Sequence, residues 1–377
     1  MSRQRRQNVV VVCHLGRAGY NVQRALHALG LRAYLVHDKH SRSVRWSRGC
    51  KLLHRADELD LADADDISAK INTLHRRIGI SSVIPTDVAA TRLVSRMQAS
   101  LRPPVFPIPD LDLLRKLDSK WQFAKICQER QIPIPKTLYF VNSSAFDPRQ
   151  VAAELGYPVI IKPEVGFGQR NIVIVAGPAD AEAYRIGDTH SSGIIVQEFI
   201  DGRDWALSTF SRNGIVTHWC TWECPGQLEA QETTSRYGVA RFQTTNFRDH
   251  DALVDMGRRV IAATGYSGVA NFDARLAANG RMVLLECNPR FFNRMLAARI
   301  CGLDFLAAGL YGSEDDRCSL SECDYYPWQD MFTRRGWNRL RSGEWKSSQL
   351  ATDLSEMIRD PLPPLIRKFI GEDQKAL

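Results

Sequence analysis

Residues 271–294, NFDARLAANGRMVLLECNPRFFNR, contain two apolar runs on either side of the turn signal AANG. This pattern predicts a β-hairpin. Side chains along a strand alternate between its two faces, so Glu286 and Asn288 point the same way while Cys287 points into a core. Asp273, on the partner strand, can share the face of Glu286. The hairpin therefore predicts two carboxylates and an amide oxygen at one place.

Such a cluster needs a cation, because buried like charges repel each other strongly. Oxygen ligands favour hard cations, so we expect Asp273, Glu286 and Asn288 to bind Mg²⁺ or Mn²⁺. Arg290 follows at the same spacing of two, and its planar guanidinium suits a phosphate or a carboxylate. The alternative is a structural acid pair closed by salt bridges. Packing alone gives no reason for the regular placement of the asparagine and the arginine.

A magnesium ion with few protein ligands usually has a phosphate partner. The sequence has no GxxxxGK[ST] motif, which excludes a Walker-type loop. Residues 159–172, VIIKPEVGFGQRNI, instead place Lys162 at the end of a buried strand, before Gly166 and Gly168. Glycines let backbone N–H groups approach an anion closely. This stretch predicts a phosphate-binding loop, although GFG by itself is equally typical of a plain hairpin.

Two further motifs are weaker alone. Lys120 begins a predicted helix, where a lysine is ordinarily a surface residue. The apolar strand that ends in Gln197 and Glu198 could pair its backbone with the edge of an adenine, and Asp204 could accept hydrogen bonds from ribose hydroxyls. Without the other motifs this segment is only a strand end and a turn.

Residues 8–38 have the pattern strand, glycine-containing loop, helix, strand, and a helix at 62–79 followed by a strand continues it. This alternation favours a parallel α/β sheet. The proline-rich residues 102–110 mark a seam, and residues 111–131 predict one long helix. Strands dominate from 203 to about 290, and the tail 310–377 is polar and helical.

The composition is that of an ordinary globular protein, and 377 residues suggest two or three subdomains. The net charge of +8 is mild and accompanies no nucleic-acid-binding signature, so no nucleic acid partner is expected. No apolar run reaches the roughly 20 residues that cross a bilayer, so no membrane partner is expected. The nine cysteines are scattered without a CxxC pair. They indicate a reduced, cytoplasmic protein with most thiols in the core and no cysteine-based metal site.

Taken together, these motifs resemble the ATP-grasp superfamily, closest to its carboxylate–amine ligases and to the carbamoyl-phosphate synthetase and biotin carboxylase type. The resemblance covers roughly residues 8–310. ECNPR is its most specific element, VIIKPEVGFG is the next, and DSK, IIKP, VQEFI and ECNPR follow in the family order.

The resemblance implies an α/β fold, with an N-terminal Rossmann-like (pre-ATP-grasp) parallel sheet, a two-subdomain ATP-grasp fold of antiparallel sheets, and a helical C-terminal tail. The implied division is an N-terminal domain at 1–110, a small lid subdomain with its leading helix at 111–195, a large subdomain with the Mg-ATP site at 196–310, and a C-terminal extension at 311–377.

The implied reaction uses ATP and Mg²⁺ (or Mn²⁺) to join a small carboxylic acid to an amine through an acyl phosphate, releasing ADP and phosphate. By resemblance, the ATP-binding residues are Lys120, Lys162, Gly166, Gly168, Gln197, Glu198, Ile200 and Asp204, the metal ligands are Asp273, Glu286 and Asn288, and Arg290 and Lys162 are catalytic. The loop from Glu164 to Gln169 would close over the phosphates. A homodimer is a family-level expectation. No residue stands out as a general base.

The sequence departs from the family pattern at Cys287, where an aliphatic residue is usual, and at FFNRM after NPR, which leaves the acceptor unidentified. Residues 222–243, which include Arg236 and Arg241, are expected to contribute to substrate recognition. One alternative is an NAD(P)-dependent oxidoreductase, because Gly16 and Gly19 imitate a Rossmann start, one glycine short of GxGxxG. A non-catalytic nucleotide-binding scaffold is the other.

Overall fold

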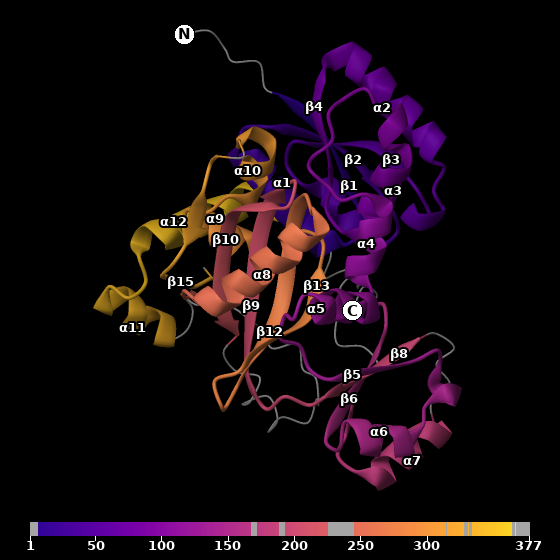
Figure 1. Ribbon diagram of the computed structural model, residues 1–377. Helices are drawn as coiled ribbons and strands as arrows, with labels where there is room; N and C mark the ends of the chain where they lie inside the picture. The colour runs from indigo at the N-terminus through magenta and orange to yellow at the C-terminus, as the bar shows by residue number, and fades with distance from the viewer. Residues whose placement is uncertain are drawn as a thin grey trace.

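The computed structural model describes residues 7–166, 172–187, 193–224, 245–313, 315–327, 331, 334–363 and 366. Three β-sheets organise this part of the chain (Figure 1). A parallel sheet near the N-terminus and a large antiparallel sheet lie next to each other, and a small antiparallel sheet with its two helices forms a separate lobe. These features confirm the predicted fold class.

The N-terminal sheet consists of β1 (Asn8–Cys13), β2 (Arg32–His37), β3 (Cys50–Arg55) and β4 (Ile80–Pro85), in the order β3-β2-β1-β4 with all pairs parallel. Helices α1 (Gly16–Ala28), α2 (Ala64–Ile78) and α3 (Val88–Met97) connect or follow these strands. The four valines of β1 are fully buried, as expected for a strand covered on both faces. The predicted α/β alternation is therefore confirmed, and β3 is an addition to it.

The proline-rich seam is packed into the protein rather than forming a free linker. Phe106 donates its backbone N–H to the carbonyl of Val83 at 2.9 Å, which aligns the seam with β4. Its ring lies 5.9 Å from Phe210 and 5.4 Å from Phe291, centroid to centroid. The seam thus joins the core of the parallel sheet to that of the large sheet.

The single helix predicted at 111–131 is wrong. The structure has α4 (Leu111–Asp118) and α5 (Lys120–Glu129), separated by Ser119 in an extended conformation. The Ser119 hydroxyl caps α5 by accepting from the N–H of Gln122 at 3.1 Å and donates to the Glu164 carboxylate at 2.6 Å. A serine that caps a helix favours a helix start, and this contact between distant segments fixes the break.

The small sheet has the order β5-β8-β6-β7 and is antiparallel. Its strands are β5 (Thr137–Phe140), β6 (Val159–Pro163), β7 (Val173–Val175) and β8 (Ile194–Glu198), and its helices are α6 (Pro148–Glu154) and α7 (Pro178–Gly187). Figure 1 shows both helices against the same face of this sheet.

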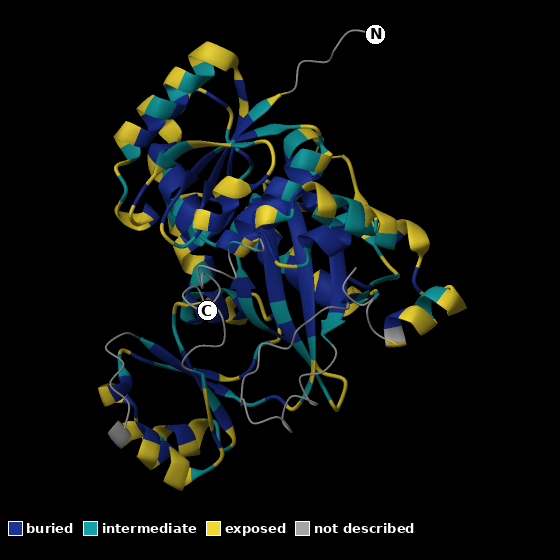
Figure 2. Ribbon diagram, turned by 180° about the vertical axis from the view of Figure 1, so that it is seen from behind, coloured by how far each residue is buried: buried dark blue, intermediate teal, exposed yellow. Residues whose placement is uncertain are grey.

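The large sheet has the order β13-β12-β9-β10-β11-β15, with β14 beside β10. Its strands are β9 (Gly202–Arg212), β10 (Ile215–Cys224), β11 (Thr245–Phe247), β12 (Gly268–Ala277), β13 (Met282–Asn288), β14 (Cys318–Leu320) and β15 (Cys323–Tyr325). Helix α8 (Asp251–Thr264) packs against the large sheet. Figure 2 shows the strands of this sheet as the buried centre of the molecule. Sequence patterns did not predict β14 and β15, since three residues are too few to show a period.

The remaining α-helices are α9 (Met295–Ile300), α10 (Phe305–Tyr311), α11 (Arg334–Ser342) and α12 (Ser347–Arg359), and the 3₁₀ helices are η1 (Arg42–Trp46), η2 (Leu59–Leu61), η3 (Gln98–Ser100) and η4 (Ser143–Ala145). The described part of the tail therefore contains the predicted helices, α11 and α12, and also the strands β14 and β15, which the helical prediction did not include. Arg24 of α1 binds Asp353 and Glu356 of α12 at 3.2 and 3.1 Å, which ties the tail to the N-terminal sheet. Within the described ranges, no helix has both the length and the apolarity that a bilayer crossing requires.

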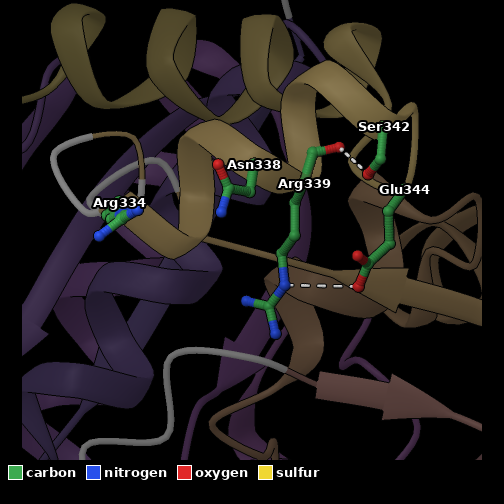
Figure 3. Close-up of a pocket in the computed structure, with 5 residues that line it drawn as sticks. All are labelled: Arg334, Asn338, Arg339, Ser342 and Glu344. Atoms are coloured by element: carbon green, nitrogen blue, oxygen red, sulfur yellow. Dashed lines mark hydrogen bonds and ion pairs between the residues drawn. The ribbon is translucent and has the colours of Figure 1, made fainter.

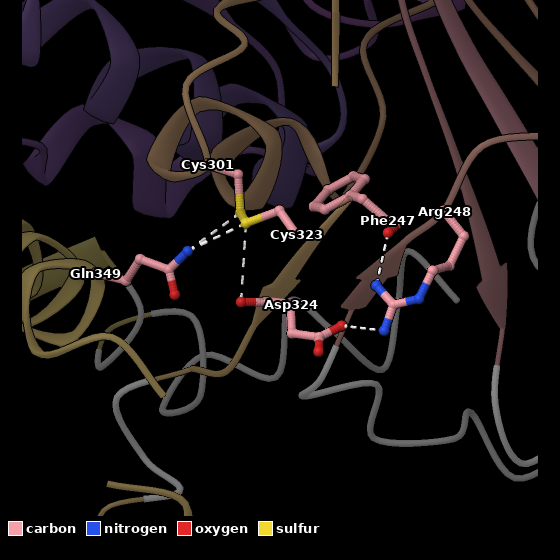
Figure 4. The surroundings of a disulfide bond; sticks show 6 residues. All are labelled: Phe247, Arg248, Cys301, Cys323, Asp324 and Gln349. Carbon is pink, nitrogen blue, oxygen red and sulfur yellow. Dashed lines mark hydrogen bonds and ion pairs between the residues drawn. A yellow bond between two sulfur atoms is a disulfide. The ribbon is translucent and has the colours of Figure 1, made fainter. Parts of the chain in front are cut away.

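A disulfide that sequence analysis did not predict joins Cys301, just after α9, to Cys323 at the start of β15 (Figure 4). Gln349 of α12 donates to the Cys323 sulfur at 3.1 Å, so three segments of the C-terminal part meet there. Four of the seven free cysteines are buried, namely Cys13, Cys127, Cys220 and Cys287, so the predicted core position holds for four of the nine.

The packing of α10 on the seam gives a stability prediction. A Cβ on Gly309 would overlap the Phe106 ring. Gly309→Ala should therefore lower the free energy of unfolding by about 1–3 kcal/mol through overpacking. Gly177→Ala is the matched control, because a Cβ there meets nothing within 4 Å, and it should change stability by no more than about 0.5 kcal/mol. Urea denaturation measures both, and equal stability of the two variants would contradict the predicted packing.

Candidate active site

The predicted hairpin brings the two acids and the amide together. Asp273 of β12 lies directly opposite Glu286 of β13, beside a register shift in the pairing. The Asn288 side chain donates to the Asp273 carboxylate at 3.2 Å and to the Glu286 carboxylate at 3.4 Å. Asn271, which sequence analysis did not select, donates to Asp273 at 2.9 Å. The Glu286 side chain keeps 25% of its surface exposed, so the cluster is open on one side.

The two carboxyl groups hold one proton between them. Burial raises the pKa of Asp273 to about 8, and the charge of Glu286 and the hydrogen bond with it act in the same direction. For Glu286, burial alone would raise the pKa, but Lys120 and Lys162 outweigh it and hold that pKa at about 2. Near neutral pH, Glu286 is therefore ionised and Asp273 carries the proton. This arrangement is typical of like charges forced together.

Lys120 and Lys162 approach the same corner from different elements. The Lys120 ammonium, at the start of α5, lies 3.5 Å from the Glu286 carboxylate and donates to the carbonyl of Gly166 at 3.0 Å. Lys162, on β6, is buried, and burial lowers its pKa while the charge of Glu286 opposes that shift. The small sheet, α5 and the large sheet thus meet at Glu286.

Arg290 is a third cation near the two acids, in addition to Lys120 and Lys162. Its guanidinium donates to the Asn288 side-chain oxygen at 3.0 Å. The charge of Arg290 also acts on Asp118, the first residue of the DSK motif, to which sequence analysis gave no role. Burial raises the pKa of Asp118 against the charges of Arg92, Lys120 and Arg290, and Arg92 lies 2.9 Å from its carboxylate.

The predicted adenine-binding strand β8 lies between β5 and β6. Gln197 is buried and donates to the Thr137 hydroxyl at 3.0 Å, while its side-chain oxygen has no hydrogen-bond partner. The Glu198 carboxylate accepts from Arg281 at 3.0 Å. Strand β8 therefore carries one buried acceptor, the side-chain oxygen of Gln197, that has no hydrogen-bond partner.

Ile200 and Asp204 are joined by one arginine. Arg275 of β12 donates to the Ile200 carbonyl at 2.9 Å and to the Asp204 carboxylate at 2.6 Å. Asp204 lies within β9, directly opposite Arg275, so it is part of a ladder rather than of a turn. The predicted residues Gly168 and Gln169, and Arg236 and Arg241 of the predicted recognition loop, lie outside the described residues.

Two other features bear on where ligands can bind. In the described part of the chain, no group of three or more His, Cys, Asp and Glu side chains is placed to hold a metal ion. An open cavity on α11 is lined by Arg334, Asn338, Arg339, Ser342 and Glu344 (Figure 3). In Figure 1, α11 lies at one edge of the molecule and α5 near its centre, with β9, β12 and α8 between them, so this cavity is separate from the candidate active site.

The described geometry agrees with similarity to known proteins. Residues 119–310 match the family "Carbamoyl-phosphate synthase L chain, ATP binding domain". A D-alanine–D-alanine ligase from Pseudomonas putida is 26% identical over 203 residues, which cover 49% of this chain and 60% of that ligase. The matches cover 17%, 55% and 60% of the length of the first three curated relatives, so the chain spans less than two thirds of each of them.

Two similar solved structures support the same fold. An L-amino acid ligase from Bacillus licheniformis has a TM-score of 0.61 at 17% identity, covering 83% of this chain and 78% of the ligase. The biotin carboxylase domain dimer of the Hydrogenobacter thermophilus 2-oxoglutarate carboxylase, solved with MgADP, has a TM-score of 0.58 at 14% identity, covering 84% and 71%. Since the family match covers half of its length, the chain belongs to the family of the carbamoyl-phosphate synthase L chain ATP-binding domain, within the ATP-grasp superfamily.

Proposed function

We propose that this protein is an ATP-dependent ligase that joins a carboxylate to an amine through an acyl phosphate and releases ADP and phosphate. The observation that carries the proposal is the meeting of Asp273 and Glu286 with two lysines and an arginine, where the two sheets of the ATP-grasp fold adjoin. That arrangement is suited to a metal-bound polyphosphate, which supplies both the positive ion that the acids need and the negative oxygens that the lysines need.

The acid pair fits a divalent cation. Asp273 keeps its proton because burial and the charge of Glu286 outweigh the opposing effects of Arg290 and Asn271, and a bound cation would favour the ionised form. Asp273, Glu286 and Asn288 would hold Mg²⁺ (or Mn²⁺), with oxygen donors that hard cations prefer. When bound, the ion would neutralise charge on the nucleotide phosphates.

The nucleotide would lie between the small and large sheets. Lys120 and Lys162 are the cations available for its phosphates, and Gly166, whose carbonyl already binds Lys120, would belong to the loop that covers them together with Gly168. The unsatisfied oxygen of Gln197 suits the amino group of adenine. Glu198 and Ile200 would frame the base, and Asp204, oriented by Arg275, would bind the ribose.

Catalysis would depend mainly on positioning and on charge stabilisation. Arg290 lies beside the proposed metal ligands, where its guanidinium could bind the transferred phosphoryl group or the acyl phosphate. The substrate carboxylate would attack the γ-phosphorus of ATP, and the amine would then displace phosphate from the acyl group. A homodimer, a cytoplasmic location and the division at residues 110, 195 and 310 remain part of the proposal.

Neither alternative has comparable support. A Cβ on Gly19 would overlap the Cys13 sulfur, so this glycine permits close packing of α1 on β1 without any dinucleotide. A scaffold would have no use for an acid pair that needs a cation. A screen for ADP release over pairs of carboxylic acids and amines, with mass detection of products, tests the ligase. ATP binding without turnover for any pair would favour the scaffold.

The shared proton gives a prediction about pH. Asp273 is protonated in the folded protein up to about pH 8 but ionised in the unfolded chain above about pH 4. Unfolding in this range releases a proton, so the free energy of unfolding should fall as pH rises from about 4 to about 8. Asp273→Asn should make that slope smaller in urea titrations with EDTA. The exposed Asp112→Asn is the control and should keep the wild-type slope between pH 5 and 8. A wild-type slope in Asp273→Asn would contradict the shared proton.

Lys162→Met keeps the volume of the buried chain and removes its charge. We expect the dissociation constant for ATP, measured by isothermal titration calorimetry, to rise about 10- to 100-fold, because a hydrogen bond to a charged group contributes about 1.5–3 kcal/mol. Lys116→Met, an exposed lysine on α4, should leave it unchanged. An unaltered affinity in Lys162→Met would count against the phosphate contact.

Glu286→Gln should strongly lower Mg²⁺-dependent ADP release while leaving the circular dichroism spectrum unchanged, because the neutral amide oxygen binds the cation more weakly than a carboxylate and does not compensate its charge. The loss should be at least about 100-fold in turnover. The control is Glu154→Gln on α6, an exposed glutamate that binds only its own helix neighbour Gln150 among the contacts described. Turnover at the wild-type rate in Glu286→Gln would remove this residue from the metal site.

A further inference from the structure

A second polar cluster lies at the carboxyl edge of the parallel sheet. His14 directly follows β1, Asp38 directly follows β2, and Asp87 lies just before α3, after β4. Ligands of open parallel sheets bind at this edge, outside the carboxyl ends of the strands. The ATP and metal contacts proposed above use none of these residues.

Asp38 fixes the protonation of the His14 ring. The Asp38 side chain is fully buried and accepts from the backbone N–H of His40 at 2.9 Å. One of its oxygens lies 2.5 Å from His14 Nδ1. An ionised carboxylate can only accept hydrogen bonds, so Nδ1 carries the ring proton and the lone pair of the neutral ring is on Nε2. The His14 side chain keeps 23% of its surface exposed, so a ligand can reach it.

Asp87 holds the backbone at His14. One of its carboxylate oxygens accepts from the backbone N–H groups of His14 at 2.8 Å and Leu15 at 2.9 Å. The same side chain caps α3 by accepting from the N–H of Ala90 at 3.0 Å. The imidazole is therefore held by Asp38 and the backbone of His14 by Asp87, both of them buried carboxylates. A carboxylate bonded to Nδ1 keeps a proton-transfer group in one orientation.

The acids around His14 oppose the effect of burial on its pKa. Burial lowers the pKa of His14, but the hydrogen bond to Asp38 and the charges of Asp87, Asp38 and Asp60 outweigh it, so that the pKa is raised overall. His40, whose ring centroid lies 4.8 Å away, is the other titratable group that faces it, and burial and the charge of His14 lower the pKa of His40.

The edge that holds His14 adjoins the segment that holds Arg290. Helix α1 begins two residues after His14, and Asn21 in its second turn donates to the carbonyl of Asn293 at 3.3 Å. Helix α3 begins beside Asp87, and Thr91 one turn later lines a small cavity together with Arg290 and Phe291. Of the two helices that start at this edge, α1 thus bonds to Asn293, and α3 shares a small cavity with Arg290 and Phe291.

We propose that His14, positioned by Asp38, accepts the proton of the amine substrate in the second half of the reaction. The inference rests on the proposed ligase function and adds a role to it. The amine nitrogen forms the C–N bond to the acyl carbon, the bond from that carbon to the phosphate oxygen breaks, and phosphate leaves with the electron pair. The proton lost from the nitrogen goes to Nε2 of His14. The substrate class is an amine with an N–H to lose, such as an amino acid.

The experiment separates the two half-reactions. Hydroxylamine is a neutral, strong nucleophile near pH 7 and traps an acyl phosphate as a hydroxamate without a base. An amino acid amine is largely an ammonium ion at that pH and must lose protons. Wild type, His14→Asn and Asp38→Asn are assayed with ATP, Mg²⁺ and every carboxylic acid of the ADP-release screen, the twenty amino acids included, once with hydroxylamine and once with the amines of that screen.

His14→Asn should form hydroxamate within about twofold of the wild-type rate but form amide about 100-fold more slowly or worse, the usual contribution of a general base. Asp38→Asn should slow amide formation and move the acidic limb of its pH profile to lower pH, because the charge that raises the pKa of His14 is lost. His54→Asn, on the edge strand β3, is the matched control and should match wild type in both assays.

Each outcome decides the question. Amide formation at the wild-type rate in His14→Asn, or an equal loss of hydroxamate and amide, overturns the role of His14, because the second result shows only a structural role. If His14→Asn does not fold, the pH limb of Asp38→Asn decides, and an unshifted limb is negative. If wild type forms neither hydroxamate nor amide, the ligase function itself fails and the inference fails with it.

Discussion

The repulsion between Asp273 and Glu286 is the constraint on which the candidate active site depends. Two carboxyl groups face each other across a hairpin, and only one of them is ionised near neutral pH. The charge of Glu286 is stabilised by Lys120 and Lys162, which come from parts of the chain far from the hairpin. The electrostatic state of the pair therefore reports whether the small sheet, α5 and the large sheet are correctly assembled.

This dependence links fold to function through a few polar contacts between sheets. The backbone N–H of Lys120 donates to the carbonyl of Glu164 at 3.0 Å, and the Ser119 hydroxyl binds the carboxylate of the same residue. Helix α5 is thereby fastened to the end of β6, next to Lys162. A shift of the small sheet would move both lysines together relative to Glu286. Because the same lysines stabilise the charge of Glu286 and are proposed to bind the nucleotide, the proposed nucleotide binding and the protonation of the acid pair depend on each other.

The hairpin was predictable because its information is local. The alternation of Glu286, Cys287 and Asn288 and the AANG turn fix the register, which the structure confirms. The break at Ser119 was not predictable from residues 111–131, because the contact that fixes it comes from Glu164. For the same reason His14 passed unnoticed. Its partners Asp38 and Asp87 lie 24 and 73 residues away, and only the parallel order of β1, β2 and β4 brings them to one edge.

The charge balance also explains why an acid–base group would lie outside the metal cluster. Asp273 and Glu286 are both proposed metal ligands, and a carboxylate that binds the cation is not free to take up a proton. The pKa of the buried Asp118 is raised, but Arg92 occupies its carboxylate. A cluster built to hold phosphates and a cation cannot also take up the proton of an amine without losing the charge that holds it together. A base on a separate element, oriented by its own buried carboxylate, avoids that conflict, and the carboxyl edge of the parallel sheet provides one in His14.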